Sequence, residues 1–260
     1  MIVLEDDLFV SAEFYQYAQQ AYAFYKHEEK VAGIALYHNT FNEVAYCPFE
    51  PVHDGTDVYF MQVPCSWGQL WTKEQWQLFR SYQQKETTTD DSLLPPTVQQ
   101  WPDASSWKKI FYRYLAKTNR YFVYPRIGLS TNFGDPGQHL TNAQSNFQTP
   151  VLLGRKEIHF SSFNAALSIY DGYYEPSGVV YNRRFQKNIS VTFDLNGTKS
   201  LKNISTEYLL SCKQCKHPEQ QFGVACYPYE NNVFLSLTAE TGESCFSLGK
   251  TSMFTDENSF

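Results

Sequence analysis

Apolar and polar positions in the first half of the chain follow the pattern of an α/β protein. Short apolar runs predict four strands, at residues 2–4, 31–37, 58–63 and 121–124. Apolar residues that recur at helical spacing predict three amphipathic helices, over residues 11–30, 72–84 and 107–119. Strands that alternate with helices are typical of an α/β sheet with helices packed against it.

Capping signals support the predicted helix starts. Thr72 and Gln75 have the spacing of a capping box. Ser11 is a plausible N-cap for the first helix, and either Ser105 or Ser106 suits the third. These residues predict where each helix begins.

The pattern changes after Pro150. Short alternating runs separated by turn residues predict strands at 158–163, 190–195, 208–211 and 232–237. We therefore predict two parts, residues 1–150 with α/β organisation and residues 151–260 as a β-rich C-terminal extension.

Two polar segments interrupt the first part. Residues 85–96 combine charge, Thr and Pro, which is typical of an exposed lid or insertion. Residues 128–148 contain glycines, have no periodicity, and exceed the length of an ordinary connection. The second segment is the stronger candidate for a binding loop.

Composition excludes several classes of protein. With 260 residues, 42% of them hydrophobic and 18% charged, the chain is globular rather than disordered. Its net charge of −6 argues against nucleic acid as a partner. The sequence has no apolar run long enough for a membrane span and no signal peptide, which predicts a cytoplasmic protein, either free or attached peripherally at the inner face of a membrane.

Aromatic residues are unusually abundant, at 17% of the chain. Flat amphipathic rings suit the faces of sugars, although packing in a β-rich core explains most single rings better. The six cysteines are scattered, which favours reduced thiols. Cys212 and Cys215 form a C-x-x-C pair that would suit zinc, but no second ligand pair follows at the usual spacing.

An acidic triplet, Glu5-Asp6-Asp7, directly follows the first predicted strand. Open α/β sheets place ligand-binding groups at the carboxyl ends of strands. Mg²⁺ or Mn²⁺ takes one or two carboxylates and fills its other positions with water and phosphate oxygens. The alternative is an acidic segment that stabilises the N-terminus of the following helix.

The order of motifs favours the metal site. I-V-L-E-D-D is followed by a helix and a strand, then S-W-G, a Trp-anchored helix, and Y-P-R-I-G-L-S-T-N-F-G-D-P-G-Q-H. This order resembles the catalytic half of GT-A type glycosyltransferases, in particular bacterial family 2 enzymes of surface-polysaccharide synthesis and, more distantly, N-acetylglucosaminyltransferase I. The resemblance covers residues 1–150 and implies a partial GT-A-like (Rossmann-like) mixed sheet with flanking helices.

The resemblance implies a function. The chain would be a metal-dependent, inverting glycosyltransferase that uses Mn²⁺ or Mg²⁺ and moves a sugar from a nucleotide-sugar donor to a glycan or lipid-linked acceptor. Asp7 would be the metal ligand. The substrate-binding residues that it implies are Glu5, Asp6, Trp67, Gly68, Gly134, Gly137 and His139.

Each of these residues has an implied role. Glu5 and Asp6 would bind sugar or ribose hydroxyls and metal-bound water. Trp67 and Gly68 would lie beneath the sugar. The other three residues would belong to a loop that closes over the diphosphate, where His139 would contact a phosphate; an ordinary surface histidine is the alternative.

One position departs from the family. Inverting members have an Asp after the Trp that starts the third helix, as the base for the acceptor hydroxyl, whereas here Lys108 follows Trp107. Asp103 is the nearest substitute, or only a helix cap. This departure keeps two alternatives open: a non-catalytic carbohydrate-binding or partner protein, and a phosphodiester or pyrophosphate hydrolase.

The acidic triplet also lies very early in the chain. In the resembling enzymes, strands that bind the nucleotide precede it. We therefore predict that residues 1–260 are the C-terminal part of a longer or split enzyme. A separate N-terminal polypeptide would then be a partner, and the chain alone would self-associate and show little transfer.

Overall fold

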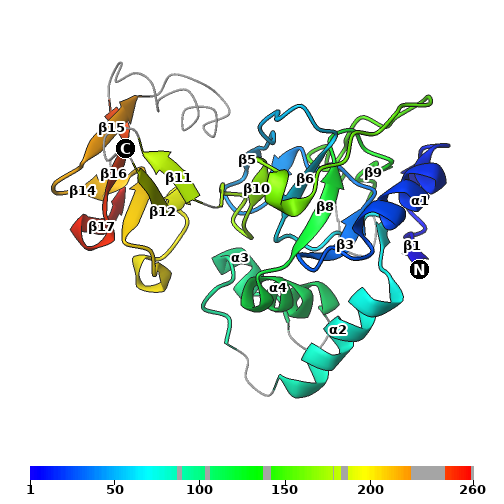
Figure 1. The fold of residues 1–260 in the computed structure, drawn as a ribbon, viewed down its shortest axis with the longest axis horizontal. Helices are drawn as coiled ribbons and strands as arrows, with labels where there is room; N and C mark the ends of the chain where they lie inside the picture. The colour runs from blue at the N-terminus through cyan, green and yellow to red at the C-terminus, as the bar shows by residue number, and fades with distance from the viewer. Residues whose placement is uncertain are drawn as a thin grey trace. The chain divides into compact units, whose positions relative to one another are not determined.

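The computed structural model describes residues 1–86, 90–102, 106–136, 142–177, 179–182, 187–223 and 244–258. The chain divides into two compact units, Met1–Ser168 and Ile169–Phe260 (Figure 1). The first unit spans every site residue that the resemblance implies.

A mixed sheet forms the centre of the first unit. Five of its strands have the order β1 (Ile2–Val3), β7 (Gln69–Leu70), β3 (Val31–Ala35), β8 (Tyr121–Pro125) and β6 (Val58–Met61). β3 and β8 are parallel, β7 is antiparallel to both of its neighbours, and β6 is antiparallel to β8. β1, β3 and β8 therefore run in one direction and end at the same edge of the sheet, which we name the carboxyl edge.

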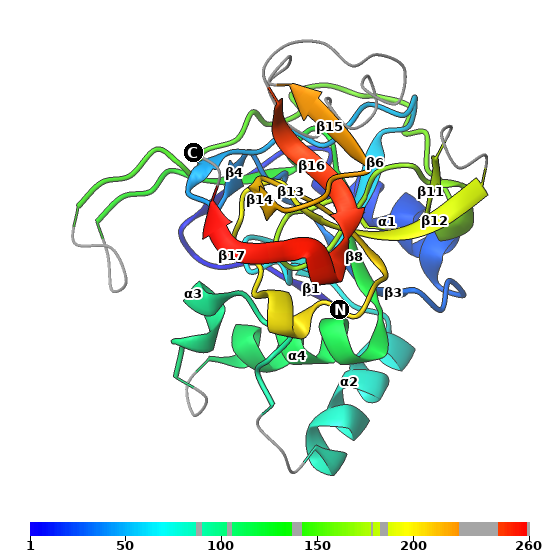
Figure 2. The same cartoon turned by 90° about the vertical axis from the view of Figure 1, so that its left-hand side faces the viewer.

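Helices flank this sheet, and Figures 1 and 2 show α1 on the opposite side from α2 and α4. The helices are α1 (Phe14–Tyr25), α2 (Lys73–Lys85), α3 (Pro96–Gln99) and α4 (Trp107–Thr118). Tyr25 of α1 contacts Phe60 of β6, with ring centroids 6.0 Å apart. On the other side, Phe111 of α4 lies 4.3 Å from Phe79 of α2 and 5.4 Å from Phe122 of β8. The predicted α/β class, with a mixed sheet and flanking helices, is confirmed.

Two of the three predicted helix starts are confirmed. Thr72 and Gln75 form a complete capping box at the start of α2, and the Ser106 side chain accepts a hydrogen bond from the N–H of Lys109 in α4. The first helix differs, because the Ser11 hydroxyl accepts from the N–H of Glu13 at 3.1 Å. That bond forms a turn before the helix, so α1 begins three residues later than predicted.

The first unit continues beyond residue 150, where the sequence analysis places its end. Phe160 stacks on Phe24 of α1 at 5.4 Å, and the Tyr25 hydroxyl donates to the Ser161 carbonyl at 2.7 Å. The apolar run 158–163 therefore covers α1, and the strand predicted there is wrong. A short 3-10 helix, η1 (Phe163–Ala165), follows it.

Two small ladders accompany the main sheet. They pair β2 (Leu8–Val10) with β9 (Ser130–Asn132), and β4 (Phe41–Asn42) with β5 (Cys47–Pro48). The first ladder joins the segment after the acidic triplet to the start of the predicted binding loop. Beyond it the Gln144 N–H donates to the Gly134 carbonyl at 2.9 Å, and Figure 2 shows the two arms of this loop running side by side away from the sheet.

The second unit consists mainly of strands. Its larger sheet has the order β11 (Val179–Asn182), β12 (Lys187–Asp194), β13 (Tyr208–Ser211), β16 (Ser244–Lys250) and β15 (Gln220–Gly223). It also contains β10 (Ile169–Tyr170), β14 (Lys213–Cys215), β17 (Phe254–Asn258), η2 (Leu201–Asn203) and η3 (Thr251–Met253). Cys212 lies in the apolar core with Phe193 and Leu210. Burial raises the pKa of the Cys212 thiol to about 11, which disfavours the thiolate that zinc requires.

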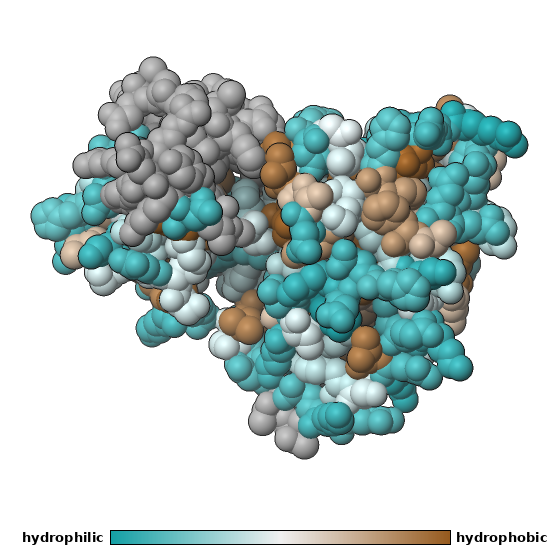
Figure 3. All heavy atoms as spheres, in the orientation of Figure 1, coloured by the Kyte–Doolittle hydropathy of each residue, from teal (hydrophilic) through white to brown (hydrophobic). Residues whose placement is uncertain are grey.

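The surface of the first unit is mixed in character. On the face seen in Figure 3, apolar side chains lie singly or in small groups among hydrophilic ones. In the part of the chain that the structure describes, no helix combines the length and apolar character needed to cross a membrane.

Candidate functional site

The candidate residues gather at the carboxyl edge because of the direction of the strands. The acidic triplet follows β1 and is exposed, and Tyr37 follows β3. Trp67 and Gly68 precede the antiparallel β7 and therefore lie at the same edge. Segments far apart in sequence thus meet where an open α/β sheet binds its ligands.

Asn132 orients the carboxylate of Asp7. The Asn132 side-chain oxygen accepts the Gly134 N–H at 2.7 Å, which requires its nitrogen to face the other way. That nitrogen donates to Asp7 Oδ2 at 2.9 Å. Asn132 is 7% exposed, so a buried amide holds an exposed carboxylate at the carboxyl edge.

Gly134 is required by this arrangement. Its φ is +67°, and a Cβ there would lie 1.7 Å from the Gln144 carbonyl oxygen. Only glycine fits at this point of the loop. The resemblance implies a phosphate-binding loop here, and the structure shows that Gly134 supplies the backbone N–H that fixes the Asn132 amide.

The backbone of Trp67 and Gly68 is fixed to the sheet. Ser130 Oγ donates to the Trp67 carbonyl at 2.5 Å, and the Leu36 N–H donates to the Gly68 carbonyl at 2.9 Å. Gly68 has φ +90°, and a Cβ there would lie 3.0 Å from Ser130 Oγ. Glycine at this position therefore lets the loop lie against the end of β3, while Trp67 stays partly exposed.

Aromatic side chains extend from Trp67 and form what we name the aromatic wall: Trp67, Tyr37, Phe147, Phe41 and Tyr46. Ring centroids along it are 4.8 Å apart for Tyr37 and Trp67, and 4.9 Å for Trp67 and Phe147. Phe147 lies 5.8 Å from Phe41, which lies 5.0 Å from Tyr46. The Tyr37 hydroxyl donates to the Phe147 carbonyl at 2.9 Å, which holds the binding loop against the end of β3.

Tyr46 ends the aromatic wall in an unusual conformation. Its φ is +55°, in the left-handed region that a bulky residue rarely adopts, and it is 73% exposed. The Asn42 side chain accepts the N–H groups of Val44 and Ala45, which forms the turn between β4 and β5. Strain in an exposed aromatic residue is a reason to look for a binding role.

Two neighbouring lysines of α4 have different environments. Lys109 is 3% exposed and donates to the carbonyls of Gln99 and Trp101, so it joins the segment before α4 to the helix. Lys108 is partly exposed and lies 3.7 Å from a Glu43 carboxylate oxygen. Its ammonium also lies 5.4 Å from the ring centroids of both Trp67 and Trp101. Lys108 therefore lies against the aromatic wall at Trp67.

Cys65 is a buried thiol beside the Trp67-Gly68 loop. Its Sγ donates to the Gly68 carbonyl at 3.4 Å. Burial raises the pKa of this thiol to about 12, while the charge of Lys108 lowers it and that of Glu5 raises it. Cys65 is thus a protonated thiol with both charged groups in its surroundings.

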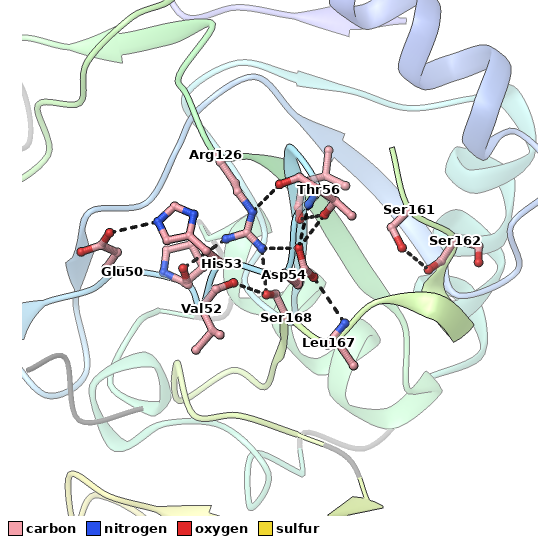
Figure 4. A network of polar contacts seen from close by, with 12 residues as sticks. Glu50, Val52, His53, Asp54, Thr56, Arg126, Ser161, Ser162, Leu167 and Ser168 are labelled. Carbon is pink, nitrogen blue, oxygen red and sulfur yellow. Dashed lines mark hydrogen bonds and ion pairs between the residues drawn. The ribbon is translucent and has the colours of Figure 1, made fainter. Parts of the chain in front are cut away.

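Arg126, directly after β8, holds a buried polar network (Figure 4). Its Nε donates to the Thr56 carbonyl at 2.8 Å and its Nη1 to the Pro51 carbonyl at 3.1 Å. Nη2 donates to Asp54 Oδ1 at 2.9 Å and to Ser168 Oγ at 2.8 Å. With these four acceptors engaged, the guanidinium stabilises the loops at this edge.

His38 is a neutral histidine beside this network. The Asn39 N–H donates to the Tyr59 hydroxyl oxygen at 3.0 Å, so that hydroxyl can donate its own proton to His38 Nδ1, 3.3 Å away. The ring also bonds to the Pro125 carbonyl, which requires a proton on the other nitrogen. Burial lowers the pKa of His38 to about 4.

The folded protein should lose stability at mildly acidic pH through His38. Since its pKa is about 4 in the folded state and ordinarily 6.5, the unfolded chain binds a proton first as pH falls. Stability present above pH 6.5 is lost between 6.5 and 4, by up to about 1.4 kcal/mol per pH unit. Urea unfolding at several pH values measures this slope. His38→Gln should reduce it and the exposed His53→Gln should not; equal slopes in both variants would contradict the assignment.

The sequence-predicted site residues have different outcomes. The structure brings Glu5, Asp6, Asp7, Trp67, Gly68 and Gly134 to one edge of the sheet. Asp103, Gly137 and His139 lie outside the described residues. Sequence reasoning missed Asn132 and Glu43, although an Asn after a strand and beside a glycine-containing loop is a recognisable signal for the first.

The site offers oxygen ligands to a hard cation. Across the described ranges there is no group of three or more His, Cys, Asp or Glu that could hold a metal ion. The three exposed carboxylates at the end of β1 instead suit an ion that takes one or two protein oxygens and completes its shell with phosphate and water.

We compared the chain with models of known protein families and with curated proteins. No model of a known protein family matches the chain, and no curated protein matches it. The chemistry of the carboxyl edge is therefore what bears on the function.

Proposed function

We propose that the chain is a metal-dependent glycosyltransferase of GT-A type, which transfers a sugar from a nucleotide-sugar donor to a glycan or lipid-linked acceptor with inversion. One observation carries the proposal: Asp7, oriented by the buried Asn132, shares the carboxyl edge with Trp67 and the aromatic wall. A carboxylate for a divalent ion and a flat aromatic surface for a sugar are two of the parts that such a transfer needs.

The fold supports the GT-A type. The acidic triplet follows a strand of a mixed sheet, and the antiparallel β7, which begins after Trp67-Gly68, lies between β1 and β3. The ladder of β2 and β9 then holds the segment after the triplet against the start of the binding loop. This topology brings to one edge the separate segments to which we assign donor and acceptor binding.

Asp7 and its neighbours fit Mn²⁺ or Mg²⁺ by the chemistry of their oxygens. When bound, such an ion neutralises charge that develops on the leaving diphosphate. Asp7 would hold the ion, while Asn132 keeps the Asp7 carboxylate in one orientation. Glu5 and Asp6 would accept hydrogen bonds from sugar or ribose hydroxyls, as exposed carboxylates can.

The test uses the intact chain and measures binding and transfer separately. UDP, GDP and dTDP are titrated with and without Mn²⁺ by calorimetry, and a panel of nucleotide sugars is incubated with oligosaccharide acceptors for product detection by mass spectrometry. We expect Mn²⁺-dependent binding of one nucleotide and a glycosylated product from its sugar. No binding and no product across the panel would overturn the proposal.

Tyr46 is expected to act on acceptor binding rather than on folding. Tyr46→Ala should weaken the binding of an oligosaccharide acceptor by about 5-fold, since stacking of an aromatic ring is worth on the order of 1 kcal/mol. The free energy of unfolding should change by less than about 1 kcal/mol, because the side chain is exposed. Acceptor KM and urea unfolding measure the two effects. Tyr15→Ala, at an exposed ring of α1, is the control, and equal acceptor KM in the two variants would exclude Tyr46 from the binding surface.

A second candidate function is a non-catalytic carbohydrate-binding protein. Lys108 favours it, because resembling enzymes carry their catalytic Asp after the corresponding Trp and an ammonium cannot act as that base. Oligosaccharide binding without Mn²⁺-dependent nucleotide binding would support this candidate over the enzyme.

A further inference from the structure

The Glu43 carboxylate lies beside Lys108, next to the aromatic wall. Glu43 is half-buried in the turn between β4 and β5, and its Oε1 lies 3.7 Å from Lys108 Nζ. Lys108 in turn lies over Trp67 at 5.4 Å. Lys108 thus occupies the position where the resembling enzymes carry an aspartate, and it pairs with Glu43 from another segment of the chain.

Glu43 also acts electrostatically on Tyr37, the residue of the aromatic wall that follows β3. Burial raises the pKa of Tyr37 far above its usual value, and Cys65 and Glu43 raise it further. Glu43 therefore lies beside the aromatic wall, since the Lys108 ammonium is 3.7 Å from its carboxylate and 5.4 Å from the Trp67 ring centroid.

Hydrogen bonds and ring contacts stabilise the turn that carries Glu43. Asn42, 1% exposed, accepts two backbone N–H groups of the turn. Phe41, immediately before it, contacts Phe147 and Tyr46 in the aromatic wall. Lys108 is held by cation–π contacts with Trp67 and Trp101, so the partner of Glu43 is also fixed. A positioned carboxylate is what general-base catalysis requires.

We propose that Glu43 is the catalytic base that accepts the proton of the acceptor hydroxyl, an assignment that rests on the proposed function. The acceptor oxygen forms its bond to the anomeric carbon as its O–H bond breaks and the proton passes to the Glu43 carboxylate. The bond between the anomeric carbon and the diphosphate oxygen breaks, and its electron pair leaves with the nucleoside diphosphate. Lys108 is a positioning residue that orients the Glu43 carboxylate.

The experiment compares Glu43→Gln with wild type in the transfer assay. The variant should lower kcat by about 10²-fold or more, the usual scale for loss of a general base. Affinity for Mn²⁺ and nucleoside diphosphate, measured by calorimetry, should stay unchanged. The acidic limb of the pH profile of kcat should disappear. Glu50→Gln, at an exposed glutamate of the adjacent loop, is the matched control and should keep wild-type turnover.

Lys108→Met separates positioning from catalysis. It should lower kcat, but less than Glu43→Gln does, and leave the affinity for Mn²⁺ and nucleoside diphosphate unchanged, because the base remains but is no longer oriented. A wild-type kcat would overturn the positioning role.

Different failures have different meanings. Turnover by Glu43→Gln within a few-fold of wild type would overturn this assignment alone. If Asp103→Asn abolishes transfer in the same series, the role of base passes to Asp103. A wild-type chain that neither binds a nucleoside diphosphate with Mn²⁺ nor forms product would overturn the proposed function, and this assignment with it.

Discussion

Replacing Arg126 with methionine is expected to lower the free energy of unfolding by about 3–5 kcal/mol, the usual effect of removing one partner from a buried ion pair. The Asp54 side chain is 3% exposed, so its carboxylate would keep its burial and lose its cation. Burial by itself raises the pKa of Asp54, but hydrogen bonds with Thr56 and the charge of Arg126 outweigh it, and the pKa lies below its usual value. Removing the guanidinium also leaves the Pro51 and Thr56 carbonyls without a donor.

Urea unfolding of Arg126→Met measures the loss. Lys156→Met is the matched control, since Lys156 pairs with Asp57 at 2.7 Å but is 35% exposed, and an exposed pair contributes only about 0–1 kcal/mol. The double variant Arg126→Met/Asp54→Asn should recover part of the loss because it removes the unpaired charge. Equal losses from Arg126→Met and Lys156→Met would show that the network in Figure 4 contributes little.

The elements that the sequence predicted correctly have local signals. The buried strands β3, β6 and β8 are apolar runs, and both Thr72 with Gln75 and Ser106 act on backbone groups within three residues. The short strands β7 and β9 are buried but contain polar residues, so no apolar run marks them. The strand prediction for residues 158–163 was wrong because an apolar run indicates burial but not strand pairing. Phe160 packs on Phe24 of α1, and the Ser161 carbonyl accepts a hydrogen bond from Tyr25, so the segment is packed without joining a sheet.

The candidate site could be predicted only in part, for a physical reason. The acidic triplet and Trp67 stand out because their residue types suggest chemistry by themselves. Asn132 acquires its role only through Asp7, which is 125 residues away in the sequence. Glu43 acquires its role only through Lys108, which lies on another element. Only the folded chain brings such pairs together, since strand direction and the β2–β9 ladder determine which loops meet.

Asp7→Ala is expected to abolish Mn²⁺-dependent binding of a nucleoside diphosphate, because it removes the carboxylate that we propose as the metal ligand. Asn132→Ala keeps that carboxylate and removes its orienting amide, and it should weaken Mn²⁺ affinity by about 10–100-fold, as loss of a hydrogen-bonding partner of a ligand usually does. Calorimetric titration of Mn²⁺ in the presence of UDP, GDP or dTDP measures both.

The two variants should differ in stability as well as in binding. Asp7 is exposed, so Asp7→Ala should change the free energy of unfolding by less than about 0.5 kcal/mol, as should the control Asp90→Ala at an exposed carboxylate before α3. Asn132→Ala leaves the N–H of the buried Gly134 without its acceptor, which should destabilise the chain by about 1–3 kcal/mol. If Asp7→Ala binds Mn²⁺ and nucleotide as tightly as Asp90→Ala, Asp7 is not the metal ligand. If Asn132→Ala also keeps wild-type affinity, the amide serves the loop and not the carboxylate.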